Sequence, residues 1–223
     1  MTWLQKARLY GGVGSIILLI APFVSGFLDA IFNILTNIIG KVEFSVLILS
    51  FILPEFVSIV GYILILKGVK LISEANNERA IFNNVLYAIM LFIIGPIAVS
   101  IGGLVFLYDY LKEFLQDRNI ASRLSPEEAI SLLCSLLLWF FILIVLIAIF
   151  YIAGAIFLRK GFYRIAELVK IEHFRTVGLL YFIGSILMVI LIGGIIIFIA
   201  NIFMIIAFFS IRERPPHIPP TPV

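Results

Sequence analysis

The stretch that decides the fold runs from Ala129 to Leu158 and reads AISLLCSLLLWFFILIVLIAIFYIAGAIFL, thirty residues without one charged side chain. The hydrocarbon core of a bilayer is roughly 30 Å thick, and about 20 apolar residues in a helix cross it. This stretch exceeds that length, and other apolar stretches accompany it. The sequence therefore predicts an integral, multi-pass protein of a cell membrane.

Helix is the expected state of every apolar stretch, because a spanning segment must satisfy its own backbone hydrogen bonds and the alternation of a barrel strand is absent. A helix-start signal lies directly before the stretch at residues 129–158. It consists of Ser125, Pro126 and Glu128. The predicted fold class is all-α, a polytopic transmembrane helical bundle. The other stretches lie at residues 9–39, 44–66, 81–108 and 177–210.

Residues 177–210 decide the number of helices. As one helix they would be about 51 Å long, well beyond a bilayer core. Gly193-Gly194 lies at their middle, where a turn would make two short helices. We predict six helices, with five as the alternative if 177–210 is one unbroken helix. The six-helix arrangement places twelve Lys and Arg on one side and four on the other, which predicts a cytoplasmic N-terminus.

The amino-acid composition is not that of a soluble globular protein. The chain is 63% hydrophobic and 13% charged, against about 25% charged in an ordinary soluble domain. We expect one transmembrane domain over residues 1–211 and a Pro-rich disordered tail over residues 212–223. The net charge of +3 does not indicate nucleic-acid binding, because Lys and Arg cluster at the ends of apolar runs. The sequence holds no HExxH, GxSxG, GxxxxGK or GxGxxG motif, so no enzymatic activity, metal or cofactor is expected.

Two segments indicate an internal parallel repeat, residues 61–89 and 154–183. Five positions of the first segment match the second at a constant offset of 93, and three more match after a slip of one residue. The matches include a Lys-Gly pair and acidic positions, which are not apolar. Shared helix composition is the alternative explanation. The matched positions of the first segment are Gly61, Lys67, Gly68, Ile72 and Glu74, then Glu78, Tyr87 and Ile89.

Several segments together resemble a family of archaeal membrane proteins known as domain of unknown function, family 996. They are GGVGSIILLIAP at residues 11–22, IVGYILILKGVKLISE at 59–74, ERAIFNN at 78–84, and the long ending that starts with FRTVGLLYFIGS at 174–185. The chain departs from this family at residues 27–56. The resemblance implies an archaeal plasma membrane and carries over no activity.

Asp29 and Glu55 are carboxylates within apolar stretches, and charges at such positions are functional candidates. Each lies 13 residues from Val42. If a turn centres there, antiparallel helices would hold both at one depth, where they would share a proton or bind a cation. The alternative is that residues 27–56 project beyond the bilayer and leave both acids in water.

A basic loop is expected between the fourth and fifth apolar stretches, and it is a candidate contact for anionic lipid headgroups. Membrane orientation alone is the alternative explanation of its charges. The candidate residues are Arg159, Lys160, Arg164, Lys170 and Arg175.

The predicted function is a structural, lipid-interacting or assembly subunit of the membrane. Its partners would be the lipid bilayer and other membrane subunits or further copies of the chain. The alternative is a small-solute or ion transporter or channel that uses the intramembrane carboxylates.

Overall fold

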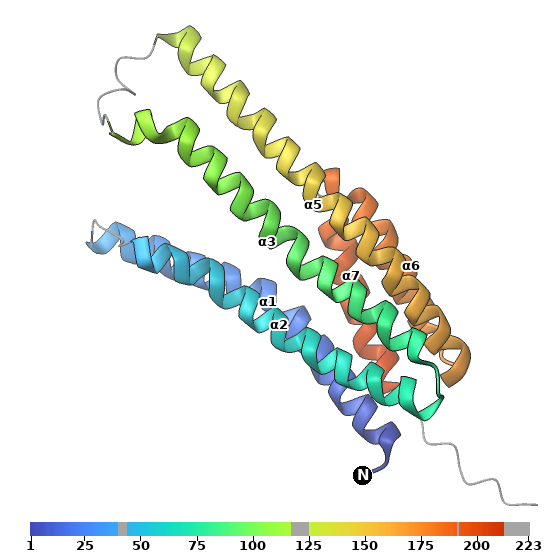
Figure 1. Cartoon of the computed structure of the whole chain (residues 1–223). Helices are drawn as coiled ribbons and strands as arrows, with labels where there is room; N and C mark the ends of the chain where they lie inside the picture. The colour runs from blue at the N-terminus through green and yellow to red at the C-terminus, as the bar shows by residue number, and fades with distance from the viewer. Residues whose placement is uncertain (40–43, 117–124, 191, 212–223) are drawn as a thin grey trace, which may run out of the picture.

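The computed structural model describes residues 1–39, 44–116, 125–190 and 192–211. In these ranges the chain is all-α, as predicted, and no strand occurs (Figure 1). The predicted disordered tail, residues 212–223, lies outside the described residues. The elements are α1 (Trp3–Ile39), α2 (Phe44–Ala75), α3 (Arg79–Gln116), α5 (Pro126–Val169), α6 (His173–Ile186), a 3₁₀ turn (Leu187–Ile190) and α7 (Gly193–Phe209).

Four of the helices are much longer than a bilayer core requires. The longest, α5, has 44 residues and therefore extends about 66 Å. Its start is the predicted one: the Ser125 side chain accepts a hydrogen bond from the Glu128 backbone, and the Glu128 carboxylate accepts one from the Ser125 backbone. Among the described residues, five helices are long and apolar enough to cross a membrane, and α7 is a shorter apolar helix.

In the part of the chain that the structure describes, the break between α6 and α7 confirms six helices and excludes the five-helix alternative. The 3₁₀ turn follows α6, and α7 begins at Gly193. A Cβ atom at Gly193 would overlap the Gly184 carbonyl oxygen and the Met188 backbone. Glycine is therefore required where α7 turns back against α6.

The helices form a closed ring at one end of the bundle. Packing contacts join α1 to α2, α2 to α3, α3 to α5, α5 to α6, α6 to α7, and α7 back to α1. Toward the other end the α1–α2 pair diverges from the α3–α5 pair, and α6 and α7 do not reach that far (Figure 1). Phe162, Phe174 and Phe208 are fully buried in the ring and meet edge to face.

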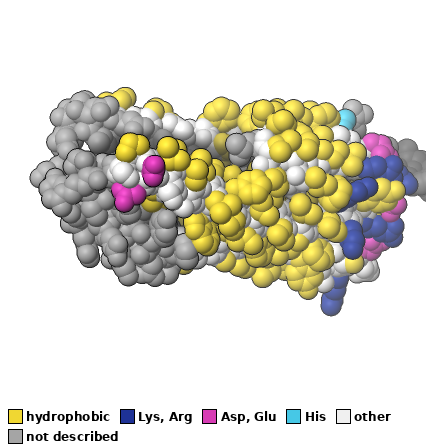
Figure 2. Space-filling view, turned by 90° about the horizontal axis from the view of Figure 1, so that it is seen from above, with side chains coloured by type: hydrophobic (Ala, Val, Ile, Leu, Met, Phe, Trp, Pro, Cys, Tyr) yellow, Lys and Arg dark blue, Asp and Glu magenta, His cyan; other side chains and the backbone are white. Residues whose placement is uncertain are grey.

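Lys and Arg gather at the closed end, next to a broad hydrophobic belt (Figure 2). We call this the basic end; it holds the connection between α2 and α3 and that between α5 and α6 (Figure 1). Both connections contain a residue with left-handed backbone, Asn77 with φ 55° and Lys170 with φ 59°. The sequence predicted that most Lys and Arg lie on one side of the membrane, and the basic end corresponds to that side.

Candidate functional site: a basic cleft beside α5 and α6

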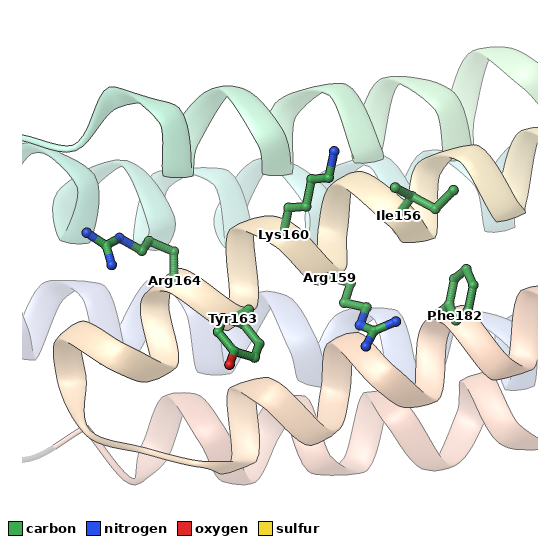
Figure 3. Close-up of a pocket in the computed structure, with 6 residues that line it drawn as sticks. All are labelled: Ile156, Arg159, Lys160, Tyr163, Arg164 and Phe182. Carbon is green, nitrogen blue, oxygen red and sulfur yellow. The ribbon is translucent and has the colours of Figure 1, made fainter.

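A cleft of about 460 Å³ opens on the surface of α5 and α6 near the basic end. We call it the α5–α6 cleft. Five of the residues that line it come from α5 and one from α6, and Figure 3 shows all six. They are Ile156, Arg159, Lys160, Tyr163, Arg164 and Phe182.

The expected basic loop is largely helix, which corrects the sequence analysis. Arg159, Lys160 and Arg164 lie in the last turns of α5, and Arg175 lies in the first turn of α6. The helix continues through these charges and through Gly161 to Val169. Spacings of three and four residues then place the cleft residues of α5 on one side of the helix.

Gly178 brings α6 close to this side of α5. A Cβ atom at Gly178 would lie 2.9 Å from the Arg159 Cα atom, so a larger residue would push the two backbones apart. This close approach places Phe182 beside Arg159. The Arg159 guanidinium carbon lies 5.4 Å from the centre of the Phe182 ring, a cation–π distance.

Arg159 and Lys160 have aromatic contacts in place of carboxylate partners. The Lys160 ammonium lies 5.9 Å from the centre of the Phe157 ring. Among the residues that the structure describes, neither cation forms an ion pair. Figure 3 shows Lys160 directed toward α3 and Arg159 directed toward α6. The cleft therefore presents two positive charges that no neighbouring acid neutralises.

Arg164 has a different role. Its guanidinium donates two hydrogen bonds of 2.7 Å to the Glu78 carboxylate and one of 2.6 Å to Glu167. The hydrogen bonds from Arg164 lower the pKa of Glu78 below its ordinary value of 4.5. Because Glu78 lies directly before α3, this ion pair joins the turn between α2 and α3 to the last turns of α5.

The remaining two basic candidates do not line the cleft. The Arg175 guanidinium carbon lies 4.3 Å from the centre of the Tyr163 ring, and Arg175 also pairs with Glu172 at 3.3 Å. It supports the cleft through Tyr163. Lys170 is the left-handed C-cap residue of α5 and donates its backbone N–H to the Ala166 carbonyl.

The structure does not test whether the two carboxylate candidates, Asp29 and Glu55, form a shared site. Glu55 lies on α2 with an exposed side chain. Asp29 lies on α1, and its side chain is outside the described residues. The described residues contain no group of three His, Cys, Asp or Glu side chains that could hold a metal ion. The shared-site hypothesis stays an untested prediction.

A buried polar contact joins α6 and α7. Tyr181 donates its hydroxyl hydrogen to the side-chain oxygen of Asn201 over 2.5 Å, and both residues are buried. The contact lies between two helices, because Tyr181 belongs to α6 and Asn201 to α7. Its role is structural, because it ties together the two short helices.

Sequence reasoning missed Tyr163, Phe182 and Ile156 as parts of the cleft. The spacing of Ile156 and Tyr163 from Arg159 and Lys160 was a usable signal, since it predicts one shared helix side. Phe182 had no such signal. Its place depends on how α6 packs against α5.

Comparisons with known proteins show a family but no activity. A family model described as "Protein of unknown function (DUF996)" matches residues 57–202. An uncharacterized protein, MJ1644, from Methanocaldococcus jannaschii is 26% identical over 211 residues, which cover 94% of each chain. No solved structure matches the chain.

Proposed function

The chain belongs to the DUF996 family of proteins of unknown function, and we propose that it is a multi-pass protein of the cell membrane that binds anionic lipid. In this proposal the N-terminus and the basic end face the cytoplasm. The chain acts as a structural, lipid-interacting or assembly subunit without catalysis. The α5–α6 cleft holds a phosphate-bearing lipid headgroup.

The observation that carries the proposal is that Arg159 and Lys160 both line the cleft and that neither forms an ion pair with a described carboxylate. A charge at the edge of a membrane is stabilised by an opposite charge or by water. An anionic headgroup offers both positive groups a strong acceptor, and each basic residue near such a surface contributes about 1 kcal/mol. Phosphate recognition also suits the planar guanidinium of arginine.

The aromatic groups around the cleft agree with a position at the membrane surface. Tyr163 and Phe182 line it, and aromatic residues are enriched where headgroups meet the hydrocarbon core. Ile156, Arg159, Lys160, Tyr163 and Arg164 are all exposed on the bundle surface. A lipid can therefore enter sideways from the bilayer without any rearrangement of the ring.

We also propose that residues 61–89 and 154–183 form an internal repeat. The left-handed residues Asn77 and Lys170 are 93 positions apart, the offset predicted from the sequence. Gly61 and Gly68 approach α1, whereas Gly154 and Gly161 approach α3, so each pair faces the preceding helix. These parallels support duplication over shared composition.

The repeat offers an internal comparison for the cleft. At the same offset of 93, Leu66 and Leu71 stand where Arg159 and Arg164 lie in the second unit. A helix hairpin of this kind therefore forms without the two arginines. Arg164 forms the ion pair with Glu78, so only the presence of Arg159 in the second unit favours a binding role over a requirement of the fold.

The test is lipid retention from vesicles of mixed composition. Wild-type protein extracted from vesicles with equal amounts of phosphatidylglycerol and phosphatidylcholine is analysed by native mass spectrometry for bound lipid. The double variant Arg159→Gln, Lys160→Gln should lose roughly thirtyfold of the preference for phosphatidylglycerol, since two contributions of about 1 kcal/mol are removed.

The matched control is Lys6→Gln with Lys70→Gln. It removes the same net charge from exposed positions of α1 and α2 outside the cleft and should retain the wild-type preference. An equal loss in both double variants would show a general surface-charge effect and would reject the cleft as a site.

The transport alternative rests on Asp29 and Glu55, and the Asp29 side chain lies outside the described residues. It makes an opposite prediction: purified, monodisperse protein would move ions across liposome membranes, and Glu55→Gln would stop that movement. A stoichiometric membrane protein that co-purifies from native membranes would instead support an assembly role.

A further inference from the structure

A second hollow lies on the other side of α5, between α3 and α5. It has a volume of about 390 Å³, and we call it the α3–α5 groove. Its lining is apolar apart from the hydroxyl group of one tyrosine. The lining residues are Tyr87, Met90, Leu91, Ile94 and Gly95 from α3, and Phe150 and Phe157 from α5.

Helix spacing and one glycine shape the groove. The lining residues of α3 recur at intervals of three and four, so they share one side of the helix. Gly95 has no side chain where the Phe150 ring lies, since a Cβ atom there would overlap that ring. The rings of Tyr87 and Phe157 meet edge to face with centres 5.8 Å apart and bound the groove toward the basic end.

The groove continues from the α5–α6 cleft. Lys160 lines the cleft, and its ammonium lies over the ring of Phe157, which lines the groove. Phe150 comes ten residues before Lys160 on α5, which is about 15 Å along the helix. The groove therefore runs from the two free positive charges toward the hydrophobic belt, the direction in which the chains of a membrane lipid extend from its headgroup.

We propose that the α3–α5 groove holds a hydrocarbon chain of the same anionic lipid whose headgroup binds in the α5–α6 cleft. The inference rests on the proposed function and adds a second contact to it. Lipid chains are as apolar as the groove, so transfer from bilayer to groove supplies no hydrophobic driving force. The chain gains packing contacts only. The headgroup supplies the binding, and the groove selects lipids by chain length.

Chain length in the wild-type protein is the first test. Retention of long-chain phosphatidylglycerol is compared with that of short-chain phosphatidylglycerol at equal concentration, again by native mass spectrometry. Both lipids have the same headgroup, so the cleft should bind the two headgroups with equal affinity. We expect the long-chain lipid to be retained at least about fivefold better, from the packing of the extra methylene groups along the groove.

Filling the groove is the second test. Ile94→Trp places a large ring in the groove, and Ile149→Trp makes the same change on α5 outside it. Both isoleucines are 55% exposed, so the pair is matched. Ile94→Trp should abolish the chain-length preference and keep the preference for phosphatidylglycerol over phosphatidylcholine, whereas Ile149→Trp should change neither. Met90→Phe is a milder filling variant that serves if Ile94→Trp does not fold.

The outcomes separate this inference from the proposed function. An anionic preference without any effect of chain length, or an unchanged chain-length preference in a folded groove variant, would overturn the groove and leave the cleft in place. Absence of anionic preference in the wild type would overturn both. Loss of the chain-length preference in Ile149→Trp would also count against the groove, because the effect would then belong to the whole bilayer-facing surface.

Discussion

Replacing Gly14 by alanine should separate α1 from α2. A Cβ atom at Gly14 would lie 2.6 Å from the Gly61 carbonyl oxygen and 2.9 Å from the Ile65 backbone nitrogen. Ordinary van der Waals contact of a Cβ atom begins at 3.4 Å, so the closer approach falls short by about 0.8 Å. Both obstacles are backbone atoms. A helix, and not a side chain, would have to shift.

The cost follows from a comparison within the same helix. Overpacking of this kind destabilises by typically about 1–3 kcal/mol, while glycine to alanine in a helix gains about 1 kcal/mol from backbone propensity. Gly26 also lies in α1, and a Cβ atom there would meet nothing within 4 Å. Gly14→Ala and Gly26→Ala share the propensity gain, so the difference between them isolates the overpacking. It should be about 1–3 kcal/mol.

Thermal unfolding in detergent, followed by intrinsic tryptophan fluorescence, measures the difference. A change of 1 kcal/mol shifts the midpoint by about 2–4 °C for a protein of this size, so Gly14→Ala should melt several degrees below Gly26→Ala. If Gly14→Ala melts together with Gly26→Ala or above it, the close approach of α1 and α2 at Gly14 and Gly61 is wrong.

Three further outcomes follow from named contacts. Tyr181→Phe removes the hydrogen bond to Asn201 and should lower stability by about 0.6 kcal/mol, the average for such bonds in membranes, and by no more than about 1.7 kcal/mol; an unchanged midpoint would contradict a structural role. Glu78 has a lowered pKa, so its contribution is complete above pH 4.5 and is lost as the pH falls through the lower folded value. Glu78→Gln should remove that part of the acid sensitivity, and an identical acid limb in melting curves would count against the ion pair. In a cysteine-free background of intact cells, an impermeant thiol reagent should label Glu127→Cys and spare Ala75→Cys; the reverse pattern would invert the predicted orientation.

Features set by neighbouring residues could be predicted from the sequence. The capping box at Ser125 and Glu128 follows local rules, and the structure contains it. The break at Gly193 was predicted because one helix would have been too long and a pair of glycines stood at its middle. The apolar stretch predicted at residues 44–66 lies within α2.

Features set by packing could not be predicted. The sequence suggested a loop at Arg159 and Lys160, because charges beside a membrane stretch are usually solvated connections. In the structure α5 extends through these residues to Val169, because packing against α6 stabilises the helical state of this segment. Phe182 joins Arg159 only through that packing, and no pattern in the sequence links the two. The depth of Asp29 and Glu55 likewise depends on tertiary structure.

The contact between α1 and α7 has a consequence for biogenesis. Gly11 of α1 packs against the ring of Phe208 of α7, so the ring closes between its first and its last helix in chain order. Contacts this distant in sequence form slowly. Until α7 is synthesised, after α2 to α6, α1 lacks this ring contact. During that time its small-residue side stays open to other partners. A cell that lacks a membrane-insertion chaperone should therefore lose this protein earlier than it loses bundles whose neighbouring helices are consecutive.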